Sequence, residues 1–365
     1  MTKIKDICNF LDSYAPPALQ EGYDNATLIT GNPKDELTAV LVTLDCTEEI
    51  VEEAIQTGCN LIVAHHPIVF KGLKSFTGKN YVERTIINAI KNDIAIYACH
   101  TNLDNINTGV NKKICDVLGL VNAKILAPKN DTLKKLTVFV PKENTDKLLN
   151  ALNNAGAGQI GNYKNCSFIT EGTGTFEPNE NASPHIGEKN KLEKVTENRI
   201  EVILPAYTEG DILNAMKQNH PYEEVAYYLQ TIDNKNQDIG SGMIGELKEE
   251  MNTKDFFNYL KINMNLSTFK HTKVTKQKIK KVAVCGGSGS FLLRNAISKN
   301  ADIFISSDFK YHEFFDAENK IIIADIGHYE SEVFTKDLFS EIISKKFPNI
   351  AVRLSKANTN PIVYS

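Results

Sequence analysis

Short, wholly apolar segments alternate with stretches of helical periodicity in the first third of this chain, and this alternation limits the possible folds most. The apolar segments are Leu37–Asp45, Asn60–Ala64 and Ile94–Cys99. Apolar residues with helical spacing lie before, between and after them, at 4–11, 48–56, 82–91 and 110–118. A strand that is apolar on both faces must be covered on both faces. The pattern therefore predicts an α/β fold with mainly parallel sheets.

The alternation stops after Pro128 and returns near Ile239. Between them, strand and helix patterns flank residues 156–190, which are rich in Gly, Asn, Thr and Ser and show little periodicity. This middle segment predicts a small α+β domain of the split β-α-β kind. A long final helix is expected from about Tyr329 to Lys346. We therefore expect a first α/β lobe at 1–128, an α+β domain at 129–238 and a second α/β lobe at 239–365.

Composition excludes several classes of partner. The chain has 41 Lys and Arg against 45 Asp and Glu, and a net charge of −4 favours neither nucleic acid nor an anionic membrane surface. No apolar run approaches the about 20 residues of a membrane helix, and the charged first residues do not form a signal peptide. The 7 cysteines are scattered without a C-x-x-C pair, which argues against disulfides and a zinc knuckle. We expect a cytoplasmic protein with a small-molecule partner, and no nucleic-acid or membrane partner.

Metal-binding side chains follow three of the predicted strands. Open α/β sheets bind ligands at the carboxyl ends of their strands. The three motifs are H-H-P at His65–Pro67, H-T-N-L-D at His100–Asp104 and G-H-Y-E-S-E at Gly327–Glu332. Together they offer three histidines (His65, His66 and His328) and two carboxylates (Asp104 and Glu332). This set of nitrogen and oxygen ligands suits zinc, iron or manganese.

Local geometry indicates how these residues would bind metal. His65 and His66 point in opposite directions in extended backbone, so each would face one of two metals. His328 and Glu332 are four apart and share a helical face, and a carboxylate can bridge two metals. Each motif also has a structural interpretation: a surface or hydrogen-bonded histidine pair, an Asx-turn or helix cap at Asp104, and an acidic first helical turn. The conjunction of the three motifs favours metal binding.

Further candidates lie at neighbouring strand ends. Asp308 and His312 would act as partners of the ligands or as a proton-transfer pair, or else as a helix cap with a partly exposed histidine. The G-G-S-G-S segment at Gly286–Ser290 would form either an anion-binding nest or a tight strand-to-helix turn. It lacks the G-K-[ST] ending of a P-loop. Asp45 is a candidate for the lining of the same cleft.

These motifs, in their order along the chain, resemble those of the GTP cyclohydrolase 1 type 2 homologue family. The resemblance spans essentially the whole chain and also includes Y-D-N-A-T-L at Tyr23–Leu28, S-S-D-F-K-Y-H-E at Ser306–Glu313 and H-P-Y-E-E-V-A-Y at His220–Tyr227. The chain departs from the family at Tyr23 and Ala26-Thr27, where tryptophan and a small residue are more usual.

The resemblance implies a dinuclear metal site with two divalent ions per subunit, zinc ahead of iron or manganese. His65 and Asp104 would bind the first ion, His66 and His328 the second, and Glu332 would bridge both. It also implies two α/β lobes around a shared metal cleft, an inserted ferredoxin-like domain, and a ring-shaped homohexamer. Because the ligands come from both ends of the chain, the middle segment is expected to be an insertion.

These observations predict a metal-dependent hydrolase that acts on a nucleotide-like or phosphorylated small molecule through a metal-bridging hydroxide. Glu332, His312 and Asp308 are the expected catalytic residues. GTP ring opening is the activity that the family name implies, although no residue pattern here indicates guanine recognition. The alternative is a non-catalytic metal-binding or regulatory protein whose insert binds a small-molecule effector or a partner.

Overall fold

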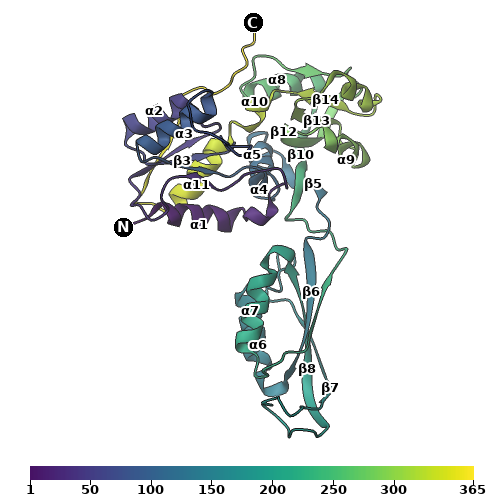
Figure 1. Cartoon of the computed structure of the whole chain (residues 1–365). Helices are drawn as coiled ribbons and strands as arrows, with labels where there is room; N and C mark the ends of the chain where they lie inside the picture. The colour runs from purple at the N-terminus through teal and green to yellow at the C-terminus, as the bar shows by residue number, and fades with distance from the viewer. The chain divides into compact units, whose positions relative to one another are not determined.

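The computed structural model describes all 365 residues, which form two compact units. The first unit consists of Met1–Pro128 together with Asp238–Ser365, and the second of Lys129–Gln237. The chain therefore leaves the first unit once and returns to it (Figure 1). No helix has the length and apolar character needed to cross a membrane.

The first unit contains a five-stranded sheet with the order β1-β4-β3-β2-β15. Strands β15, β2, β3 and β4 are parallel, whereas β1 is antiparallel to β4. All residues of β2, β3 and β4 are buried, because helix α1 packs on one face and helices α2 and α3 pack on the other. The elements are α1 (Ile4–Tyr14), β1 (Leu28–Thr30), β2 (Ala39–Thr43), α2 (Glu48–Thr57), β3 (Leu61–Ala64), α3 (Tyr81–Lys91), β4 (Ala95–Ala98) and β15 (Ala351–Leu354). This sheet is mainly parallel, as predicted.

The second sheet of this unit has six strands in the order β11-β14-β13-β12-β10-β5. Only β12, β13 and β14 run parallel to one another, so the expectation of a mainly parallel sheet is wrong here. The reason is that β5 leads out of the unit and β10 leads back into it, which places the two side by side in opposite directions. The strands are β5 (Val121–Pro128), β10 (Gly240–Asn252), β11 (Lys270–His271), β12 (Lys278–Ser288), β13 (Ile303–Ser307) and β14 (Ile322–Asp325).

The two sheets exchange strands between the early and late parts of the chain. Strand β5 comes from the early part but lies in the second sheet, and β15 comes from the late part but lies in the first. The single helix expected near the C-terminus is two helices, α10 (His328–Glu332) and α11 (Thr335–Lys346). The other helices of the unit are α4 (Thr101–Asp104), α5 (Val110–Val117), α8 (Thr253–Asn263) and α9 (Leu293–Ser298), with short 3-10 turns η1 (Pro17–Leu19), η4 (Ser290–Leu292) and η5 (Tyr311–Ala317).

The second unit is a four-stranded antiparallel sheet with the order β7-β8-β6-β9. Helices α6 and α7 cover one face of it, where the apolar core lies (Figure 1). Strand β7 is an exposed edge strand, and for that reason its sequence shows no apolar alternation. The elements are β6 (Leu133–Pro141), η2 (Lys142–Asn144), α6 (Thr145–Asn154), β7 (Phe168–Phe176), β8 (Glu193–Pro205), η3 (Ala206–Thr208), α7 (Glu209–Asn219) and β9 (Tyr227–Thr231).

Two substitutions in helix α11 test the packing of the first unit. Phe339 is fully buried in its core, so Phe339→Ala should lower the free energy of unfolding by about 3–5 kcal/mol. Ser344→Ala, at an exposed position of the same helix, should change it by less than about 0.5 kcal/mol. Urea denaturation of the full chain measures both, and equal midpoints for the two variants would contradict this packing.

Candidate metal centre

Histidine and carboxylate side chains from both sheets of the first unit converge at one place. His65 and His66 follow β3, His100 follows β4, and α10 carries both His328 and Glu332. Their ligand atoms form three groups, each with all atoms within 4.8 Å of one another. The groups are His65 with Asp104 and Glu332, His66 with His328 and Glu332, and His65 with His66 and His100.

Glu332 lies at the centre of this cluster and is only 3% exposed. Its Oε1 atom lies 3.9 Å from Nε2 of His65. Its Oε2 atom lies 2.9 Å from Nε2 of His66 and 3.1 Å from Nε2 of His328. One buried carboxylate therefore presents a different oxygen to each of two groups of ligands.

Each histidine of the cluster is oriented through its Nδ1 atom. The Nδ1 atoms lie 2.6–2.9 Å from acceptor oxygens. These pairs are His65 with the Cys99 carbonyl, His66 with Asp45, His100 with Asp24, and His328 with Asp308. An Nδ1–H that donates to such an acceptor leaves Nε2 free to bind a metal, and this arrangement is typical of metal-binding histidines.

Two buried atoms of the cluster have no hydrogen-bond partner. They are Nε2 of His65 and Oδ1 of Asp104, which lie 3.6 Å apart. Buried polar atoms are almost always paired, because leaving one unpaired costs about 1–3 kcal/mol. A cation between these two atoms would satisfy both. The residues present therefore fit a metal ion.

The cluster shifts the pKa values of its own members. Burial and the neighbouring Glu332 charge raise the pKa of Asp104 to about 7. Burial also acts to raise the pKa of Glu332, but hydrogen bonds from His328 and His66 and the nearby ring of His65 outweigh it and hold this pKa well below its usual value. Burial acts to lower the pKa values of His66 and His328, but their carboxylate partners raise them to about 10 and about 11. Without metal, protons therefore occupy the ligand atoms that a metal would use.

The G-G-S-G-S segment makes room for Glu332. Gly287 has φ +60°, and a Cβ atom added there would overlap Oε1 of Glu332. The Gly287 amide donates a hydrogen bond to Oγ of Ser331 at 2.9 Å, and the Gly286 amide donates one to Oδ1 of Asn111 at 3.0 Å. These amides already bind protein groups. The segment is a tight turn that accommodates the central carboxylate, and two of its amides are not available to an anion.

The structure brings together all five predicted metal ligands and also Asp308. It does not bring His312 to them, because His312 is exposed on η5 and contacts the rings of Tyr311 and Phe315. Its catalytic role stays a prediction.

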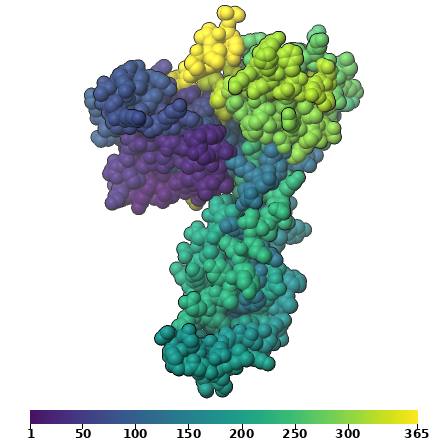
Figure 2. Space-filling view, turned by 45° about the vertical axis from the view of Figure 1, so that its right-hand side comes forward, coloured from purple at the N-terminus to yellow at the C-terminus, as the bar shows by residue number.

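Sequence reasoning missed His100 as a candidate ligand, although its position directly after a strand was a usable signal. It also missed Asp24, which precedes any strand and has no such signal. Asp45 lies at the site as expected. Its carboxylate accepts hydrogen bonds from Nδ1 of His66 and from the hydroxyl of Thr359 in the C-terminal segment. That segment, yellow in Figure 2, lies between the blue and purple early residues and the green later residues.

Comparison with known proteins identifies the family of this chain. A family model described as Duf34/NIF3 (NGG1p interacting factor 3) matches residues 2–361. The chain belongs to this family. Among its Duf34/NIF3 relatives, proteins called "GTP cyclohydrolase 1 type 2 homolog" from Bacillus subtilis and Halalkalibacterium halodurans are 37% and 38% identical. The B. subtilis alignment covers 99% of this chain and 98% of the relative, and the H. halodurans alignment covers 98% of each. The resemblance inferred from the motifs is confirmed.

Two similar solved structures share the fold. A Bacillus cereus protein related to NIF3 is 38% identical, with a TM-score of 0.85 over 100% of this chain and 99% of the other. The Staphylococcus aureus protein SA1388 is 33% identical, with a TM-score of 0.79 over 100% and 99% of the two chains. The chain therefore has the mixed α/β fold of these structures.

Gly287 provides a test of the central carboxylate. Gly287→Ala should weaken zinc affinity by about 10- to 100-fold, because the new methyl group displaces Glu332 and strains the backbone at a positive φ. Gly210→Ala should leave the affinity unchanged, since a Cβ atom there meets nothing within 4 Å. Competition with a chromophoric chelator measures both variants, and equal affinities would contradict the assigned position of Glu332.

Metal binding should release protons. His66 and His328, with pKa values of about 10 and about 11, are protonated at neutral pH, so metal and protons compete. Zinc affinity should therefore rise with pH between about 6 and 9. Calorimetry in two buffers of different ionisation enthalpy counts the released protons. Asp308→Asn should reduce that count, because Asp308 helps to raise the pKa of His328. A zinc affinity independent of pH would contradict this interpretation.

Proposed function

We propose that this Duf34/NIF3 protein is a metal-dependent hydrolase that holds two divalent ions per subunit. The observation that carries the proposal is the pair of ligand groups that share Glu332. His65 and Asp104 would hold one ion with Oε1 of Glu332, and His66 and His328 would hold the other with Oε2. Zinc is the first expectation, and iron or manganese accept the same ligands.

When bound, the two ions would supply Lewis acidity, which makes water acidic enough to act as a nucleophile and polarises a substrate oxygen. The protein's own groups prepare the site. Asp45 and Asp308 hold the Nδ1–H of His66 and His328 and so fix the direction of each Nε2 atom. The hydrogen bond with His328 lowers the pKa of Asp308, which keeps this carboxylate ionised as an acceptor. Asp308 is thus a positioning residue in this proposal.

A cavity of about 770 Å³ beside the cluster supports a small-molecule substrate. Asp45 and His66 line it on the side of the cluster. Phe70, Tyr81 and Lys71 also line it, and they offer two aromatic rings and one cation. Aromatic rings suit a base or another flat group, and a lysine suits a phosphate. The lining therefore favours a nucleotide-like or phosphorylated substrate.

The finer features of the fold belong to the same proposal. The order β6-α6-β7-β8-α7-β9 and the strand order β7-β8-β6-β9 support a ferredoxin-like domain at 129–238. We retain the lobes at 1–128 and 239–365 around a shared metal cleft, with each lobe adding one strand, β5 or β15, to the sheet of the other. The homohexameric ring is proposed from the family resemblance, and the cytoplasmic location from the sequence.

Turnover tests the proposed activity. Zinc-loaded protein should hydrolyse at least one member of a panel of nucleotides and phosphoesters, and Glu332→Gln should lower kcat/KM by at least about 100-fold. Glu330→Gln is the matched control on the same helix. Its carboxylate binds Asn360 and lies outside the three ligand groups, so activity should be retained.

Two outcomes would contradict the proposal. The first is unchanged turnover in Glu332→Gln. The second is zinc-loaded wild-type protein that binds metal stoichiometrically yet hydrolyses nothing in the panel, which would favour the non-catalytic alternative.

A further inference from the structure

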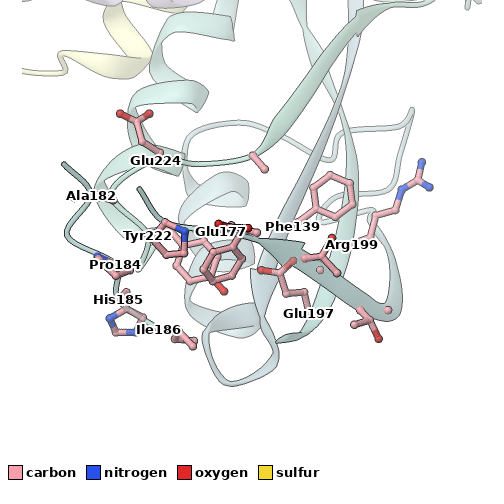
Figure 3. A pocket seen from close by; sticks show the side chains of 18 of the residues that line it. Phe139, Glu177, Ala182, Pro184, His185, Ile186, Glu197, Arg199, Tyr222 and Glu224 are labelled. Carbon is pink, nitrogen blue, oxygen red and sulfur yellow. The ribbon is translucent and has the colours of Figure 1, made fainter. Parts of the chain in front are cut away.

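A second cavity, of about 630 Å³, lies on the face of the second unit's sheet that no helix covers (Figure 3). All of its lining residues belong to this unit. Phe139, Arg199 and Tyr228 line it from β6, β8 and β9. Residues between 177 and 186, together with Tyr222, Glu223 and Glu224, complete the wall. The last three belong to the H-P-Y-E-E-V-A-Y motif, which the metal centre does not use.

Glu197 is the buried charge of this cavity. On β8, Ile200, Val202 and Leu204 face the helices. Side chains alternate along a strand, so Glu197, three residues before Ile200, lies on the opposite face of the sheet. It is only 8% exposed and forms no ion pair. The carboxylate occupies space beside Gly174 of β7, where a Cβ atom would overlap it. Buried carboxylates are normally paired, because removing a charge from water is costly.

Neighbouring cations do not balance Glu197. Arg199 forms an ion pair with Glu201, and its guanidinium points away from Glu197 (Figure 3). His220 donates from Nε2 to the Phe139 carbonyl at 2.8 Å and accepts at Nδ1 from the Tyr222 amide at 3.1 Å. Burial lowers the pKa of His220, so its ring is neutral at pH 7.

The remaining charges of the lining are also negative. Five glutamates and a single arginine line the cavity. Of the four glutamates other than Glu197, Glu171 pairs with Lys142. Glu177, Glu223 and Glu224 add further carboxylates to the lining. The cavity therefore carries an excess of negative charge around a buried carboxylate.

Aromatic rings form much of the apolar wall. The rings of Phe176 and Tyr222 lie 5.8 Å apart, and those of Phe139 and Tyr228 lie 5.7 Å apart. The buried Tyr222 hydroxyl lies beside the Glu197 carboxylate, and burial together with the hydrogen bond and the charge of Glu197 raises the pKa of Tyr222. Ring faces attract cations by about 0.5–2 kcal/mol each, and most strongly where water is excluded.

We propose that this cavity binds a small organic cation, such as an amine or a quaternary ammonium compound with an apolar body. Glu197 neutralises the charge of the ligand, and the rings of Tyr222, Phe176 and Phe139 enclose its apolar groups. The site is independent of the metal centre, since no residue is shared between them.

Choline and its neutral isostere 3,3-dimethylbutan-1-ol are the probes for this site. Titrated into the full chain and followed by NMR, choline should bind at least ten-fold more tightly than the alcohol. Glu197→Gln keeps the side-chain shape and should weaken choline binding at least ten-fold. Asp211→Asn removes the same charge from the exposed start of α7, on the other face of the sheet, and should change the affinity less than two-fold.

The proposal is overturned if choline fails to bind, if both probes bind equally, or if Glu197→Gln binds choline like wild type. A thermal melt shows whether Glu197→Gln folds. If it does not, Tyr222→Leu and Tyr222→Phe decide. The leucine variant should lose at least five-fold in affinity and the phenylalanine variant should stay within two-fold, whereas equal affinities would overturn the proposal. Zinc content and turnover are not readouts here, so failure of the hydrolase proposal leaves this result intact.

Discussion

A single buried carboxylate governs the architecture of the first unit. Glu332 is surrounded by histidines from β3 and α10, and a carboxylate at 3% exposure is tolerated only where charge or hydrogen bonds compensate it. The requirement explains several local features together. Gly287 leaves space for the carboxylate, α10 ends with Glu332 before α11 begins, and the ends of two sheets must meet. Apolar cores hold the two sheets, and residues from both sheets meet around this one charge.

The charge inventory of the cluster supports the two ions proposed above. Around the four histidines lie five carboxylates, those of Asp24, Asp45, Asp104, Asp308 and Glu332. Two divalent ions bring four positive charges, which nearly balances them. The acceptor of His65 is a neutral carbonyl, which suits the histidine of the cluster that is fully buried.

Sequence reasoning found what local patterns determine. The parallel strands β2, β3 and β4 follow from apolar runs, and the ligands follow from the rule that active side chains stand at strand ends. The orienting partners could not be predicted in the same way, because the pairing of Asp24 with His100 depends on tertiary contact between distant residues. Strand β7 lacks an apolar face, and the direction of β10 depends on where the chain returns from the second unit. Such features depend on the topology of the whole fold, which the apolar periodicity of a single segment does not determine.

The pairing of β15 with β2 has a consequence for biosynthesis. Ala351 pairs with Ala39, so the ribosome completes most of the chain before the first sheet obtains its edge strand. Until then β2 presents unpaired amides and carbonyls, a state that invites association with other chains. Asp45, just beyond β2, gains its bond from Thr359 only at the same late stage. The site can therefore be completed only after nearly the whole chain has been synthesised.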